Sequence, residues 1–213
     1  MKKNNVIMIL ILVVLLSITL IGTYAYQTYT QDTIKNTFTI GNVSVELYEI
    51  DQSGNKIDDI NQEYALERGK TYNKNMVVNV GAGSEDCYVY IVMENDLANV
   101  EAGESSANLN DASAVDYTPV ATQIANNGWT KRTTSNTDVN IYWKEIDVST
   151  DAGELDFMTE FRTKESFDYD LVRKEDNTPP VMSFTLYAVE KGSMDEANAW
   201  DLLLTKYPEL ATY

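Results

Sequence analysis

The chain has no histidine at all, and only one cysteine and four prolines, among its 213 residues. Without histidine it cannot form a Ser-His-Asp triad, a Cys-His pair or a His-Glu-x-x-His zinc motif. A single cysteine excludes an intramolecular disulfide, so the fold depends on packing and hydrogen bonds. No glycine-rich phosphate loop and no set of catalytic residues is visible. We therefore predict a protein that is not an enzyme and uses no cofactor.

Basic residues are also scarce: 16 Lys and Arg stand against 33 Asp and Glu, and the formal net charge is −17 at pH 7. So acidic a chain is an unsuitable partner for nucleic acid or for an anionic membrane surface. Acidic pairs such as Asp58-Asp59 and Glu85-Asp86 arise from this composition, and we interpret them as solvated surface. The turn from Asp51 to Asp59 carries several oxygen ligands but lacks the EF-hand pattern, so we predict no metal site; calcium at this turn remains an open alternative.

Long apolar runs are absent except at the N-terminus, where Val6–Ile21 follows two lysines. Small residues at Thr23 and Ala25 then offer a cleavage site before Tyr26, so residues 1–25 are typical of a signal peptide. Sixteen helical residues reach only about 24 Å, less than a hydrocarbon core of about 30 Å. A retained membrane anchor is the alternative. We predict a secreted protein of the extracellular matrix or cell surface, touching the membrane only through the uncleaved segment.

The remaining chain reads as strands separated by polar turns, which favours a mainly β sandwich in one domain, residues 36–213. Cys87 opens an apolar run and is predicted to be a buried strand residue. Residues 94–127 contain few large apolar side chains and are predicted to be an insertion with short helical turns. The expected strands span 36–40, 43–47, 76–80, 88–93, 139–148, 155–162 and 182–189.

A short C-terminal helix is predicted after Gly192. Ser193 and Glu196 fit a capping box, and Ala197, Trp200, Leu204 and Tyr207 recur at helical spacing. We expect this helix to pack its tryptophan face against the sandwich.

The junction Gly22–Tyr26, followed by Asp32–Leu47, resembles the SipW-dependent secreted proteins of Gram-positive bacteria, the family of the biofilm fibre protein TasA and the camelysins. Gln27-Thr28-Tyr29 departs from the family's usual continuation of the junction. The metallopeptidase activity attributed to camelysins is not carried over, because the chain has no histidine. Further matches follow in the family's order: Leu66–Tyr72, with Arg68 replacing a proline, Tyr142–Lys144, Phe184–Val189 and Ala197-x-x-Trp200.

The resemblance implies a jelly-roll-like antiparallel β-sandwich that is cut by a dedicated signal peptidase and polymerises with itself and with other matrix proteins. Residues 26–35 are then the N-terminal tail and donor strand, which completes the sheet of the next subunit. This tail is β-favouring and contains no Pro or Gly, so strand addition to an open sheet edge suits it. The residues expected to make the assembly contact are Tyr26, Thr28, Tyr29, Thr30 and Ile34.

Two other interpretations remain open for the tail and for the function. The tail can pair within its own sandwich as a first strand, or remain a loose leader. The protein can accordingly be a monomeric or membrane-anchored binding protein of the cell surface.

Overall fold

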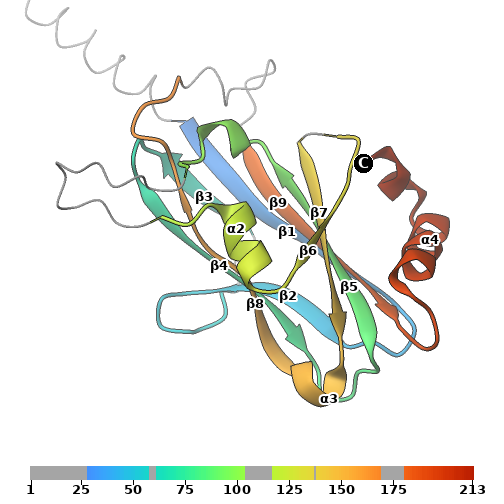
Figure 1. Ribbon diagram of the computed structural model, residues 1–213. Coiled ribbons are helices and arrows are strands. Elements are labelled where there is room, and N and C mark those ends of the chain that lie inside the picture. Colours follow the sequence, from blue (N-terminus) through green and yellow to red (C-terminus); the bar gives the residue numbers. More distant parts are fainter. Residues whose placement is uncertain (1–27, 58–60, 104–116, 137, 169–179) are drawn as a thin grey trace, which may run out of the picture.

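The structure is a computed structural model that describes residues 28–57, 61–103, 117–136, 138–168 and 180–213. Within these ranges nine strands form a six-stranded sheet, ordered β3-β1-β9-β5-β7-β6, and a three-stranded sheet, ordered β2-β4-β8 (Figure 1). The strands are β1 (Thr28–Ile40), β2 (Val45–Ile50), β3 (Asn61–Leu66), β4 (Thr71–Val80), β5 (Cys87–Asn95), β6 (Thr130–Arg132), β7 (Val139–Ile146), β8 (Gly153–Arg162) and β9 (Val181–Glu190).

The two sheets pack face to face, which confirms the predicted mainly β sandwich. Its main core combines Met76 and Phe157 of the small sheet with Ile91 and Phe184 of the large one. The ring of Phe157 meets that of Phe184 edge to face, with 6.2 Å between the centroids, a favoured geometry for aromatic pairs. All pairs of neighbouring strands are antiparallel except β1 and β9, which run parallel. This arrangement of six strands against three does not confirm the jelly-roll part of the prediction.

The long apolar run of β5 is explained by burial on both faces of the large sheet. Val89 and Ile91 point into the main core, whereas Tyr88 and Tyr90 belong to a second apolar cluster on the outer face, with Trp200. A strand covered on both faces needs no polar alternation. The C-terminal helix therefore adds a third layer over part of the sandwich, as Figure 1 shows for α4.

Short helical elements occupy the predicted insertion and the C-terminus. The insertion contains η1 (Ala98–Val100) and α2 (Val120–Asn126), and the C-terminal region contains α4 (Glu196–Lys206) and η3 (Pro208–Thr212). One further helix was not expected: α3 (Val148–Asp151) follows β7 directly. The predicted strand ends at Ile146 rather than Val148 because Asp147 caps α3, its Oδ1 accepting a hydrogen bond from the N–H of Ser149 at 3.0 Å.

The predicted capping box at Ser193 is wrong. The N-cap of α4 is Asp195, whose Oδ1 accepts hydrogen bonds from the main-chain N–H of Asn198 at 2.9 Å and from its Nδ2 at 2.8 Å. The buried stripe is correspondingly shifted: Ala199, Trp200 and Leu203 are buried, while Ala197 is exposed. The sequence offered two acidic or hydroxyl caps two residues apart, and helical spacing alone did not distinguish them.

Replacing Asp195 by alanine is expected to lower the free energy of unfolding by about 1 kcal/mol, because a helix N-cap contributes that much. Ser193→Ala, the matched control, should change it by less than about 0.5 kcal/mol, as an ordinary surface substitution does. Urea unfolding followed by tryptophan fluorescence measures both. A larger loss from Ser193→Ala than from Asp195→Ala would restore the capping-box interpretation.

The turn between β1 and β2 depends on Gly41. Its φ is +92°, and a Cβ built there would lie 2.5 Å from the Cβ of Glu190. The carboxylate of Glu190 accepts a hydrogen bond from the N–H of Asn42 at 2.9 Å. Only glycine tolerates both the positive φ and the close approach.

Candidate functional site: the N-terminal strand and the sheet edges

The N-terminal strand β1 lies inside the large sheet, between β3 and β9. Residues 28–33 pair with β3 in antiparallel register, from Thr28 opposite Leu66 to Thr33 opposite Asn61. Residues 31–34 and 37–40 pair with β9 in parallel register. The main chain of residues 31–33 is therefore held by neighbouring strands on both sides, and the structure matches the alternative in which the tail pairs within its own sandwich.

A register shift divides β1 into two halves. The pairing with β9 runs regularly to Ile34 opposite Phe184 and resumes at Thr37 opposite Leu186, with an irregularity between them. Bulges interrupt the ladder locally and bend a strand. This interruption coincides with the boundary at residues 35 and 36 that the sequence predicted between tail and domain. The first half also pairs with β3, whereas the second half pairs with β9 alone.

Four of the five predicted assembly residues, Thr28, Tyr29, Thr30 and Ile34, lie in the first half of β1. The fifth, Tyr26, lies outside the described residues, as do the predicted cleavage residues Thr23 and Ala25. The structure thus brings the described assembly residues onto one strand between two others. Their donor role and the cleavage site stay predictions.

Helix α2 and the residues that follow it lie beside the outer edge of β8 (Figure 1). The Oε1 of Gln123 accepts from the main-chain N–H of Thr159 at 2.9 Å, and its Nε2 donates to the oxygen of Glu160 at 2.9 Å. Asn127 and Trp129 donate to the carbonyl oxygens of Phe157 and Asp156, respectively. An edge whose hydrogen-bonding groups are already satisfied cannot accept another strand.

The N-terminus of helix α2 is held by the carboxylate of Glu101, which bonds to Val120, the first residue of the helix. Glu101 accepts from the N–H of Val120 at 2.6 Å and from the hydroxyl of Tyr117 at 2.8 Å. Burial raises the pKa of Glu101 and outweighs these two hydrogen bonds, which lower it. Because the folded pKa lies above the unfolded one, this group alone favours folding as the pH falls through its folded pKa.

The edges of the large sheet are less covered. In the described part of the chain β3 pairs with β1 alone and β6 pairs with β7 alone. The edge of β2 is partly protected by the following turn, since the N–H of Ile57 donates to the oxygen of Glu49 at 2.8 Å. A strand that fills the gap between β3 and β9, as β1 does, has a pairing partner on each side, unlike a strand added to an edge.

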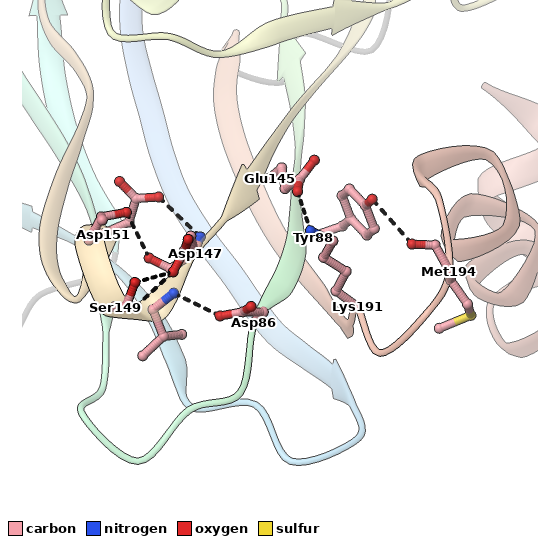
Figure 2. Close-up of polar contacts among 10 residues, drawn as sticks. Asp86, Tyr88, Glu145, Asp147, Ser149, Asp151, Lys191 and Met194 are labelled. Atoms are coloured by element: carbon pink, nitrogen blue, oxygen red, sulfur yellow. Dashed lines mark hydrogen bonds and ion pairs between the residues drawn. The ribbon is translucent and has the colours of Figure 1, made fainter.

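Three aspartates, Asp86, Asp147 and Asp151, lie close together at the end of the sandwich where β7 meets α3 (Figure 2). The Oδ1 of Asp86 accepts from the N–H of Val148 at 3.0 Å, and the Oδ2 of Asp151 accepts from the N–H of Asp147 at 3.1 Å. Hydrogen bonds from Ser149 lower the pKa of Asp147. These carboxylates are therefore engaged in closing the turn. Within the described ranges no group of three or more acidic, cysteine or histidine residues is arranged to hold a metal ion.

The turn that begins at Asp51, the alternative site for calcium, is organised by hydrogen bonds to the Asp51 carboxylate. Its Oδ1 accepts from the main-chain N–H groups of Ser53 and Asn55, each at 2.8 Å, and its Oδ2 accepts from the side chain of Asn55. The hydrogen bonds from Asn55 are the main cause of the lowered pKa of Asp51. The arrangement is an Asx turn, which polar turn residues form without a metal. Asp58 and Asp59 lie outside the described residues.

Cys87 is buried in the main core, as the sequence predicted. Burial raises the pKa of its thiol to about 12. The reactive thiolate is therefore disfavoured at neutral pH.

No family model, curated protein or solved structure matches this chain. None of the helices in the described ranges is long and apolar enough to span a bilayer. The fold itself defines a mainly β sandwich in which the first described strand, β1, is inserted between β3 and β9.

Proposed function

We propose that the protein is a secreted structural subunit that assembles into extracellular fibres by exchanging its N-terminal strand between copies. The observation that carries this proposal is the position of residues 28–34, paired with β3 and β9 and separated by a register shift from the rest of β1. Cleavage after Ala25 and the extracellular matrix location come from the sequence and its family resemblance.

The exchange has a simple energetic basis. When the first half of β1 enters the gap between β3 and β9 of another copy, it forms the same main-chain hydrogen bonds that it forms within its own chain. Exchange of an identical element between protomers is a low-cost route to association. Because each copy gives one strand and accepts one at a different surface, the contact is head to tail and can extend into a filament.

The tail is also suited to leaving its place. The irregularity between Ile34 and Thr37 lets the first half separate while residues 37–40 stay paired to β9. A segment still joined to a membrane-inserted leader would be tethered at the bilayer. Removal of residues 1–25 would then release the donor strand, so cleavage acts as the assembly step.

The net charge opposes the association of copies. Cleavage removes two of the 16 basic residues, Lys2 and Lys3, and none of the 33 acidic ones, so the mature chain carries −19. Such repulsion is long-ranged at low ionic strength and is screened within about 8 Å at 0.15 M salt. Filament yield should consequently rise with salt.

A monomeric or membrane-anchored binding protein of the cell surface is the second candidate. It is favoured by one specific observation: β1 already satisfies the gap in its own chain. In that case the mature protein remains a monomer at every concentration.

The test compares the mature chain, Tyr26–Tyr213, with a version that begins at Asn36, by gel filtration and negative-stain electron microscopy. The mature chain should form filaments and the shortened one should not. A synthetic peptide of residues 26–35 added to the shortened chain should bind one to one and raise its thermal stability, which separates loss of the strand from general misfolding. Filaments from the shortened chain would contradict strand exchange, and a mature chain that stays monomeric would favour the second candidate.

A further inference from the structure

Residues of the hairpin between β6 and β7 line an open hollow of about 430 Å³. The charge of its lining differs from that of the chain as a whole. Although acidic residues outnumber basic ones two to one, the described side chains that line the hollow include no carboxylate. They are two cations, two hydroxyls and two carboxamides: Lys131, Arg132, Thr133, Thr134, Asn136 and Asn140. The volume lies within the range of about 300–1,000 Å³ typical of small-molecule sites.

The wall of the hollow is held in place by its own hydrogen bonds. The hydroxyl of Thr134 lies 2.9 Å from the carbonyl oxygen of Val139, and the N–H of Asp138 donates to Oδ1 of Asn136 at 2.9 Å. The carbonyl oxygen of Tyr213 accepts from the N–H of Asn136 at 3.0 Å. The hairpin is thereby tied to the C-terminal segment, so the hollow is largely preformed.

Arg132 is oriented by two contacts outside the hollow. Its Nη1 lies 2.5 Å from Oε1 of Glu196, and its guanidinium stands 4.6 Å from the ring centroid of Trp200. These contacts fix the planar guanidinium, whose other N–H groups remain as donors.

Other polar groups of the lining are not engaged by the protein. Within the described ranges the side chain of Lys131 forms no ion pair or hydrogen bond, and the side chains of Thr133 and Asn140 form no hydrogen bond. Lys131 is exposed and Asn140 half-buried. A ligand in the hollow therefore finds one free ammonium, one hydroxyl and one carboxamide without displacing an internal contact.

From this lining we infer that the hollow binds a carboxylate-bearing sugar, such as a uronic acid unit of an acidic polysaccharide. The ammonium of Lys131 supplies a charged donor for the carboxylate. A carboxamide donates and accepts at once, as neighbouring sugar hydroxyls require. The described side chains that line the hollow are all polar, which disfavours a lipid chain. An acidic peptide would use edge pairing, for which β6 offers only three residues. This inference does not depend on fibre assembly.

Isothermal titration of the mature protein with a galacturonic acid trimer, at 0.15 M salt, tests the inference. Saturable binding is expected, with affinity reduced about 10- to 100-fold by Lys131→Ala, because a hydrogen bond to a charged group contributes about that factor. Asn140→Ala should weaken binding about 5-fold, the factor for an uncharged hydrogen bond. A neutral glucose trimer should bind at least 10-fold more weakly than the uronate.

Lys206→Ala is the matched control, since it removes one exposed cation of α4 that is not among the described lining residues. It should leave the affinity for the uronate unchanged, and thermal unfolding should show that each variant is folded. An equal loss from Lys206→Ala, or no binding of the uronate at all, would overturn the inference. Equal binding of a glutamate trimer, unaffected by Asn140→Ala, would reduce the site to general attraction of carboxylates and would also overturn it.

Discussion

Replacing Lys74 by methionine is expected to lower the free energy of unfolding by about 3–5 kcal/mol, the usual cost of breaking a buried ion pair from one side. The Nζ of Lys74 on β4 lies 2.6 Å from Oε2 of Glu49 on β2, and the two side chains are 4% and 6% exposed. Methionine fills most of the volume but leaves a buried carboxylate without this cation. Because domains of this size are stable by about 5–15 kcal/mol, the variant loses a large part of its stability.

The control is a second lysine that pairs with the same strand at the surface. Lys56 forms an ion pair with Glu46, and the two side chains are 44% and 52% exposed; Lys56→Met should cost at most about 1 kcal/mol. The double variant Glu49→Leu, Lys74→Met should recover much of the loss, because neither member of the pair is then left buried without the other. Chemical denaturation measures all three. Equal losses from Lys74→Met and Lys56→Met would show that the buried pair is not energetically distinct.

Replacing Gln123 by alanine is expected to destabilise the protein by roughly 2–4 kcal/mol, since buried main-chain groups left without partners each cost about 1–3 kcal/mol. Gln123 is 7% exposed and hydrogen-bonds with the main chain of Thr159 and Glu160. The change also opens the edge of β8, an exposed template for pairing with another chain. We therefore expect irregular aggregates beside any filaments.

Denaturation and light scattering together test this prediction. Asn126→Ala, on the same helix at an exposed position, is the control and should change stability by less than about 1 kcal/mol without aggregation. A Gln123→Ala variant as stable and as soluble as this control would show that α2 does not protect the edge.

The second of these predictions rests on the unequal protection of the strand edges of the sandwich. Side chains of α2 close β8, and the turn after β2 folds back on that strand, whereas β1 enters its gap through main-chain pairing. In the described part of the chain β3 and β6 each pair with one neighbour only, so the edges of the small sheet are better protected than those of the large one.

The strands that pack into the core were predictable from sequence because their side chains carry the pattern. β5 and β9 read as apolar runs, and both are buried by layers on either side. β3 and β6 were missed for the opposite reason: half of the residues of Asn61–Leu66 are polar, and Thr130–Arg132 has only three residues. Both are edge strands of the large sheet, where packing leaves little trace in composition.

The site was predictable only in part. Composition identified residues 26–35 as β-favouring, but the parallel pairing with β9 depends on residues about 150 positions away in the sequence, which local propensity does not encode. The hollow at the β6–β7 hairpin was not found, because its polar residues differ in no way from ordinary loop residues until the C-terminal segment holds them together.

The most direct test of strand exchange is a reversible lock on β1. Thr30 and Tyr64 are cross-strand partners, and such partners have Cα separations of about 4.5–5.5 Å, within the range that a disulfide spans. A variant with cysteines at both positions can be compared in its reduced and its disulfide-bonded state. The native Cys87 is 0% exposed and therefore does not compete for disulfide formation. Exchange predicts filaments from the reduced protein and only monomers once an intramolecular disulfide holds β1 in place. Equal filament formation in both states would contradict the account.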